Sequence, residues 1–231
     1  MSPRGRRERR SRALDPAAAD PPTIDPQEAG CQIFLISPPG LDPTALAPAL
    51  DAALGAGGVA AFVLRLSDAA PTAIELAAAQ LRPVCATHGV AFLLQDDARL
   101  ALEIGADGVH LGPGRRAETA AARALLGPQR ILGAACGLSR DAAMLAGEHG
   151  ADYIGLGDPE RPVNARLIEL VGWWSGLFVL PCLVEGMLDA DDCAALSRAG
   201  ADFVGVARAV FEHAGGPVAG LDAIRQAIAR P

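Results

Sequence analysis

Short apolar segments alternate with helical segments from Cys31 onward, and this alternation limits the fold more than any other feature of the chain. The apolar segments do not alternate polar with apolar residues, which is typical of parallel strands that are buried on both faces. We expect strands at 32–37, 60–66, 91–94, 108–111, 131–135, 153–156, 178–184 and 203–206. We expect helices at 44–54, 72–87, 97–104, 117–126, 140–148, 165–174, 190–198 and 221–229.

The sequence Gly-Ala-Asp occurs three times, directly before or at the start of an apolar segment. The copies begin at Gly105, Gly150 and Gly200, and each follows a helical segment. Glycine at this point suits the left-handed conformation in which many helices end. The three copies therefore indicate one repeated helix-to-strand joint, at the face of the fold that serves stability.

Strict alternation of strands and helices is found in doubly wound open sheets and in closed barrels. Eight units in about 200 residues favour the barrel. No Gly-x-Gly-x-x-Gly sequence follows the first expected strand, which weakens a dinucleotide-binding interpretation. The predicted fold class is α/β, a single (β/α)8 TIM barrel over residues 29–231. Residues 1–28, rich in Arg, Pro and Ala, are expected to form a disordered tail.

Composition excludes several classes of function. A net charge of −7 argues against a nucleic-acid-binding protein, and no apolar stretch is long enough to span a membrane. The chain contains no lysine, which excludes a lysine Schiff base and a lysine clamp on phosphate. The five cysteines form no Cys-x-x-Cys pair and are expected to be reduced thiols, as in a cytoplasmic protein. The sequence leaves open whether the protein is a homodimer.

The carboxyl ends of the expected strands should carry the active site, as they do in (β/α)8 barrels. Glycine-rich turns and arginines occur there, and both suit phosphate, because glycine lets backbone N–H groups approach and arginine matches phosphate geometry. The turns after the seventh and eighth strands contain Gly186, Ala207 and Arg208. We therefore expect a phosphorylated small molecule as ligand; the alternative is that any barrel rim is polar and rich in glycine.

Single polar residues at these strand ends have two interpretations each. Arg65 needs a partner if it points into the barrel mouth, and that partner is either a ligand or an ion pair with Asp96 or Glu185. Asp96 is either a metal ligand or a helix N-cap or rim carboxylate. His110 is expected to be a packed histidine bonded to a neighbouring loop rather than a titrating group.

Two segments carry a family resemblance. Residues 92–97 (FLLQDD) and 101–112 (ALEIGADGVHLG) resemble thiamine phosphate synthases and the related thiazole tautomerases. The likeness runs in register from about Cys31 to Phe211, nearly the whole expected barrel. It implies a transferase of thiamine biosynthesis that joins hydroxymethylpyrimidine diphosphate to a thiazole phosphate, with Mg2+ assisting the departure of the diphosphate.

The resemblance also implies roles for individual residues. Arg65 would bind the diphosphate, and Gln95 and Asp96 match an Asn-Asp pair whose aspartate holds Mg2+. From the residues themselves, we expect the remaining phosphate contacts at Arg115, Gly157, Gly186, Ala207 and Arg208.

Several positions depart from the family pattern. A Gln-x-Arg-x-Lys sequence on the second strand becomes Val63, Arg65 and Ser67, and a second metal carboxylate falls on Arg115. A serine after the fifth strand aligns with Ala135, and the loop after the sixth strand is short and acidic. We therefore expect a degraded active site. The alternative is a non-catalytic or repurposed barrel that binds a phosphorylated metabolite or a protein partner.

Overall fold

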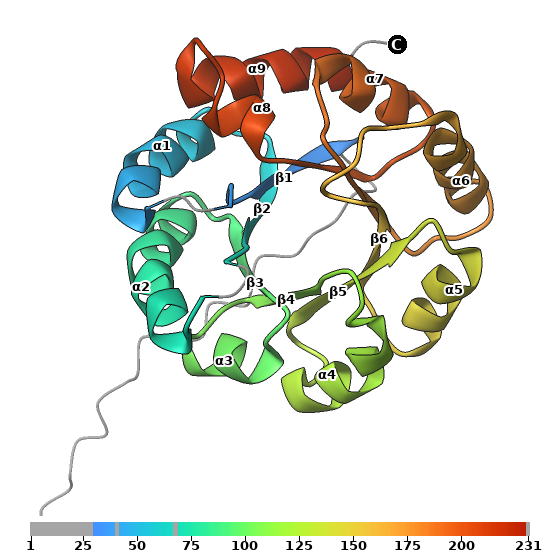
Figure 1. Ribbon diagram of the computed structural model, residues 1–231, viewed down its shortest axis with the longest axis horizontal. Coiled ribbons are helices and arrows are strands. Elements are labelled where there is room, and N and C mark those ends of the chain that lie inside the picture. The colour runs from blue at the N-terminus through green and yellow to red at the C-terminus, as the bar shows by residue number, and fades with distance from the viewer. Residues whose placement is uncertain (1–29, 40–41, 67–68, 230–231) are drawn as a thin grey trace, which may run out of the picture.

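A closed barrel of eight parallel strands forms the centre of the computed structural model, which describes residues 30–39, 42–66 and 69–229. The strands follow each other around the barrel in chain order, and β1 pairs with β8 to close it. Helices surround this barrel as an outer ring (Figure 1). The predicted (β/α)8 fold is thus confirmed, whereas the expected tail at 1–28 lies outside the described residues.

The observed elements alternate as the sequence predicts. The strands are Gln32–Ile36 (β1), Val59–Leu64 (β2), Ala91–Gln95 (β3), Gly108–Leu111 (β4), Ile131–Gly137 (β5), Tyr153–Gly157 (β6), Cys182–Glu185 (β7) and Phe203–Val206 (β8). The helices are Pro43–Gly55 (α1), Pro71–Thr87 (α2), Ala98–Glu103 (α3), Thr119–Leu126 (α4), Arg140–Glu148 (α5), Ala165–Ser175 (α6), Ala190–Arg198 (α7), Arg208–Phe211 (α8) and Gly216–Ile228 (α9), with a 3-10 turn at Arg116–Glu118. Within the described ranges, no helix has the length and hydropathy that a membrane span requires.

Several segments differ from the prediction; the last helix, for example, begins at Gly216 rather than at residue 221. The seventh strand begins at Cys182 rather than at residue 178, because Phe178 packs on the end of α6, where its ring stacks on Trp174 with centroids 4.1 Å apart. The short helix α8 directly after β8 was not expected. Its four residues are too few to show a helical periodicity in the sequence.

The three Gly-Ala-Asp copies form the same joint. Their glycines adopt the expected left-handed conformation, with φ of 68° at Gly105, 86° at Gly150 and 97° at Gly200. Each aspartate carboxylate then accepts a hydrogen bond from a backbone N–H at the start of the preceding strand. The pairs are Asp107 with Phe92 N at 2.8 Å, Asp152 with Leu132 N at 2.7 Å and Asp202 with Cys182 N at 2.8 Å. These aspartate clamps join β3 to β4, β5 to β6 and β7 to β8 at the amino end of the barrel.

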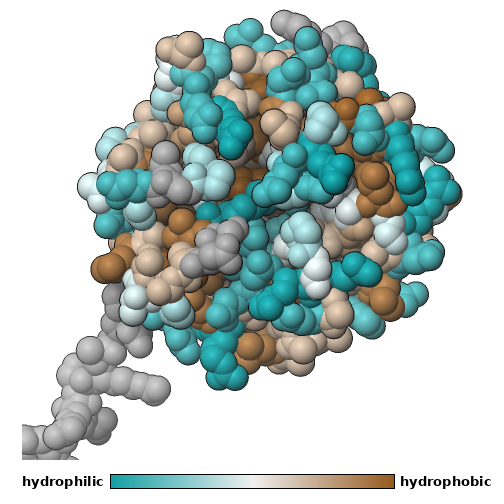
Figure 2. Space-filling view, viewed as in Figure 1, coloured by the Kyte–Doolittle hydropathy of each residue, from teal (hydrophilic) through white to brown (hydrophobic). Residues whose placement is uncertain are grey.

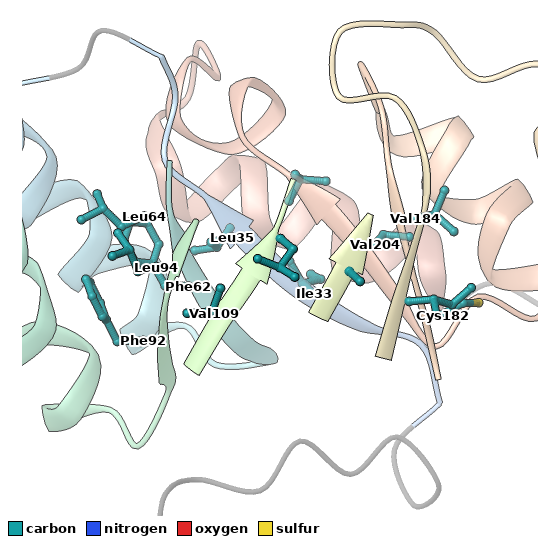
Figure 3. Packing of buried hydrophobic residues seen from close by; sticks show 14 of the residues in the cluster. Ile33, Leu35, Phe62, Leu64, Phe92, Leu94, Val109, Cys182, Val184 and Val204 are labelled. Carbon is teal, nitrogen blue, oxygen red and sulfur yellow. The ribbon is translucent and has the colours of Figure 1, made fainter. Parts of the chain in front are cut away.

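Apolar side chains pack on both sides of the sheet. The outward set lies between strands and helices and includes Ile33, Phe62, Leu94 and Val184 (Figure 3). The inward set fills the lumen, and three of its side chains are aromatic. In this set, Phe34 lies 5.3 Å from Tyr153 and 4.6 Å from Phe203 between ring centroids. The lumen is thus a packed core, and any ligand site is confined to the carboxyl end.

Removal of one clamp tests its contribution. We expect Asp107→Ala to lower the free energy of unfolding by about 1–3 kcal/mol, because a buried N–H of Phe92 loses its charged acceptor. Urea denaturation measures this change. The control is Asp222→Ala, which removes a carboxylate from an exposed ion pair with Arg225 on α9 and should cost less than about 1 kcal/mol. Equal losses in the two variants would show that the clamp has no special role.

Candidate active site at the barrel mouth

A pocket of about 940 Å³ lies at the carboxyl ends of the strands. It is bounded by the ends of β1, β2 and β3 on one side and by the loops after β6, β7 and β8 on the other. Hydrophilic side chains gather around the centre of this face (Figure 2). The described lining residues are Ser37, Pro39, Arg65, Gln95, Pro113, Asp158, Pro159, Glu160, Gly186, Met187, Leu188, Asp189, Ala207, Arg208, Ala209 and Glu212.

A buried network of polar side chains forms the floor beneath this pocket. Glu185, at the end of β7, is 2% exposed and accepts from Arg65 Nη2 at 2.5 Å through Oε1. Its other oxygen, Oε2, lies 3.1 Å from His110 Nε2, and His110 Nδ1 lies 2.9 Å from the Tyr153 hydroxyl. Arg65 also donates from Nε to Gln95 Oε1 at 2.5 Å. The network therefore joins side chains of β3, β4, β6 and β7 to Arg65, which directly follows β2.

Glu185 is ionised in this environment. Burial alone would raise its pKa, but the charges and hydrogen bonds of His110 and Arg65 outweigh burial and lower the pKa from 4.5 to about 2. Because a carboxylate only accepts, His110 Nε2 donates to it, and the other ring nitrogen, Nδ1, lies 2.9 Å from the Tyr153 hydroxyl. Burial raises the pKa of Tyr153 well above 10, so this hydroxyl keeps its proton. Each buried side-chain nitrogen and oxygen of the described residues has a hydrogen-bond partner.

Glycines on the inner face of the barrel make room for the network. A Cβ added at Gly133 would lie 2.1 Å from the ring of Tyr153, so only glycine lets this tyrosine cross the lumen toward His110. A Cβ at Gly155 would lie 3.3 Å from His110 and 3.4 Å from Glu185. The network therefore depends on small residues of β5 and β6 as well as on its own members.

The hydroxyl of Ser37 fixes the backbone directly after β2. The Ser37 hydroxyl, 2% exposed, donates to the Arg65 carbonyl at 2.9 Å and accepts from the Arg65 N–H at 2.8 Å. Arg65 is therefore held by its backbone to β1 and by its side chain to β3 and β7. Ser67, the next position of the family pattern, lies outside the described residues.

Asp96 adopts a left-handed backbone conformation, with φ of 71°, which is uncommon outside glycine and clusters at functional sites. Its Oδ1 accepts from Gly112 N at 2.7 Å, and its Oδ2 accepts from Gln95 Nε2 at 3.1 Å. The N-cap of α3 is the neighbouring residue, Asp97, whose carboxylate accepts from Leu100 N. Asp96 is thus a rim carboxylate that joins the β3 and β4 loops, and the N-cap interpretation is wrong.

Of the residues proposed from the sequence, five line the pocket together: Arg65, Gln95, Gly186, Ala207 and Arg208. Asp96 contacts Gln95 directly behind this lining. Gly157 is buried at the end of β6, where an added Cβ would lie 2.1 Å from the Glu185 carbonyl, so its lack of a side chain serves strand packing. Arg115 does not line the pocket and pairs with Glu118 at 3.2 Å.

His110 and Arg65 follow the sequence interpretation in part. His110 is packed and fully buried, but its partners lie on strands β6 and β7 rather than on a loop. Arg65 forms the ion pair with Glu185 that the sequence left open as an alternative.

Tyr153 was missed as a polar member of the site. Its apolar surroundings in the sequence gave no signal, since its position opposite His110 depends on the register of three strands.

The charge around the pocket is mainly negative. Among the described lining residues, Arg65 and Arg208 are cationic, whereas Asp158, Glu160, Asp189 and Glu212 are acidic. Arg208 lies 3.7 Å from Glu212, and both are more than half exposed, so their attraction is weak. Arg208 is therefore available to a ligand, but Arg65 already has an internal counter-ion.

A resident metal centre is not preformed in the described residues, since no three His, Cys, Asp or Glu side chains lie in a metal-binding group. Mg2+ commonly binds through one or two carboxylates together with substrate phosphates and water. Asp96 can supply one carboxylate, so the residues fit an ion that binds together with a diphosphate.

Cys136, at the carboxyl end of β5, is a poor nucleophile, because burial raises the pKa of its thiol to about 12.

Comparison with known proteins gives a consistent result. The family model described as thiamine monophosphate synthase matches residues 33–210. A thiamine-phosphate synthase from Rhodospirillum centenum is 41% identical over 200 residues, which are 83% of this chain and 94% of that protein. One from Erythrobacter litoralis is 38% identical over 198 residues, or 80% and 90% of the two chains. The solved structure of a thiamine phosphate pyrophosphorylase from Pyrococcus furiosus has a TM-score of 0.72 at 24% identity. The match covers 85% of this chain and 95% of that one, and it supports the fold.

Loss of the Glu185 charge should destabilise the protein. We expect Glu185→Gln to lower the free energy of unfolding at pH 7 by about 3 kcal/mol, because Arg65 would remain largely buried without a counter-ion. Urea denaturation measures the change. The control Glu212→Gln opens the exposed pair with Arg208 and should cost less than about 1 kcal/mol.

The lowered pKa of Glu185 predicts that the free energy of unfolding depends on pH, and the variant Glu185→Gln tests this. The pKa of Glu185 is lower in the folded than in the unfolded protein, so its stabilisation is complete above about pH 4.5 and is lost as the pH falls toward 2. Stability of the wild-type protein should therefore fall more steeply across this window than that of Glu185→Gln. Parallel curves would contradict the assignment of Glu185 as an ionised group.

Proposed function

The chain belongs to the thiamine monophosphate synthase family, and we propose that it joins hydroxymethylpyrimidine diphosphate to a thiazole phosphate, giving thiamine phosphate and pyrophosphate. The match spans most of the chain and nearly the full length of the curated relatives. The observation that supports this function best is that one pocket contains two separate groups suited to anions. One is Arg65 with Gln95, and the other is Gly186 with the Ala207–Arg208 turn.

The first group would bind the diphosphate of the pyrimidine substrate. Arg65 keeps Nη1 for a ligand, because its Nε and Nη2 donate to Gln95 and Glu185. Gln95 orients the guanidinium and also donates to Asp96. Asp96 would hold Mg2+, which supplies positive charge that favours departure of the diphosphate. The left-handed backbone of Asp96 fixes the position of this carboxylate beside Gln95.

The second group would receive the phosphate of the thiazole substrate. Gly186 and Ala207 offer backbone close to the pocket, and Arg208 adds an exposed guanidinium. Loops after the seventh and eighth strands commonly bind phosphate in this fold. Arg115 would contribute nothing to this site, since it lies outside the lining.

A second candidate function is binding of a phosphorylated metabolite without turnover. It is favoured by the ion pair between Arg65 and Glu185, which neutralises a cation that the chemistry would use. We also propose that the active site is degraded, since Val63, Ala135 and Arg115 depart from the family pattern. The protein is also proposed to be cytoplasmic, in keeping with five cysteines that form no disulfide.

Purified full-length protein, supplied with both thiamine precursors and Mg2+, tests the main proposal. We expect thiamine phosphate and pyrophosphate in equal amounts, measured by chromatography and by a coupled phosphate assay, and we expect EDTA to abolish both. Thermal stabilisation by the precursors without any product would support the binding function instead. If the precursors give no product and do not stabilise the protein, both functions are rejected.

Substitution of Arg208 separates the two anion groups. We expect Arg208→Gln to raise the KM for the thiazole phosphate about tenfold with little change in kcat, because a charged contact is lost equally from the ground state and the transition state. Initial-rate kinetics with each substrate varied in turn measure this effect. Arg161→Gln is the matched control, since Arg161 is an exposed arginine of the β6–α6 loop outside the lining. A higher KM for the diphosphate substrate instead would reverse the assignment.

A further inference from the structure

Glu185 combines three properties that the proposed chemistry does not require of it. It is almost fully buried, it is ionised, and it lies directly beneath the pocket in which a diphosphate is proposed to bind. Both of its oxygens are occupied, one by Arg65 and the other by His110. A purely structural role would be served as well by two apolar side chains in place of Glu185 and Arg65, since replacement of a whole buried ion pair costs little net stability.

The position of Glu185 changes what Arg65 can offer to an anion. An unpaired arginine attracts phosphate by its full charge and by parallel donors. Here Nη2 donates to the carboxylate and Nε donates to Gln95, so the pair presents no net charge to the pocket. A free diphosphate would bring several negative charges close to the buried carboxylate of Glu185.

The rim strengthens this effect. Among the described lining residues, four carboxylates outnumber two guanidinium groups, and one of these guanidinium groups is already neutralised from below. A diphosphate that carries a divalent cation loses most of its own negative charge. Such a complex meets less repulsion, and its cation can also be attracted by the carboxylate of Asp96.

We propose that Glu185 is a specificity-determining residue that makes the site accept a diphosphate as its magnesium complex and reject the metal-free anion. This inference rests on the proposed function, since it concerns the diphosphate group of that site. Glu185 touches no substrate and acts through Arg65, so it is a positioning residue.

Binding of inorganic pyrophosphate, measured by isothermal titration calorimetry with either EDTA or Mg2+, tests the proposal without any turnover. The wild-type protein should bind the magnesium complex at least about tenfold more tightly than the metal-free anion. In Glu185→Gln, the metal-free anion should gain about tenfold in affinity, so the ratio of the two dissociation constants falls toward one. The glutamine amide can be accommodated, because its oxygen can accept from Arg65 and its nitrogen can donate to a neutral His110.

The matched control is Glu212→Gln, which removes one negative charge from the same pocket but leaves Arg65 paired. In this control, the ratio of the two dissociation constants should differ from the wild-type ratio by less than about threefold. An equal change in Glu212→Gln would show that net charge alone sets the preference. A ratio unchanged in Glu185→Gln, with both affinities reduced together, would show a purely structural role. Either result overturns the proposal.

The wild-type arm remains informative if Glu185→Gln does not fold. Tight binding of metal-free pyrophosphate by the wild-type protein would by itself overturn the proposal. The result is also separate from the proposed function. A ratio that falls toward one in Glu185→Gln, in a protein without turnover, would support the role of Glu185 and reject the synthase activity, whereas turnover with an unchanged ratio would do the reverse.

Discussion

Eight parallel strands that close on themselves leave no free sheet edge, so their own side chains must fill the space that they enclose. The rings of Phe34, Tyr153 and Phe203 help to fill the lumen. Toward the carboxyl end the inward positions become polar, and their charges must be neutralised within the barrel. Glu185 meets this requirement for Arg65, so the arginine beneath the pocket is paired with a carboxylate of the same barrel.

The two ends of the barrel are stabilised differently. At the amino end, three aspartates at helix-to-strand joints bond to backbone N–H groups of the neighbouring strands. At the carboxyl end, bonds between side chains of different strands are added, as in the network around Glu185. Residues at the amino end can therefore keep the fold while those at the carboxyl end change, which is how one scaffold hosts different chemistry.

Much of this organisation could be predicted from the sequence. The apolar runs and the Gly-Ala-Asp copies predicted the barrel and its joints, because each depends on local periodicity and backbone conformation. The pairing of Arg65 with Glu185 was one of two ion pairs that the sequence left open. The link from His110 to Tyr153 could not be predicted, because it requires Gly133 on a third strand to leave space. Helix α8 was missed because four residues show no period.

The network across the lumen also has a mechanical consequence. Strands on opposite sides of a barrel share no backbone hydrogen bonds, yet Arg65 beside β2 is tied to β7 through Glu185, and His110 extends the connection to β6 through Tyr153. The loops that follow β6 and β7 form the far wall of the pocket. A ligand that displaces the Arg65 side chain must therefore strain both walls at once, so the two halves of the mouth respond to binding as a coupled unit.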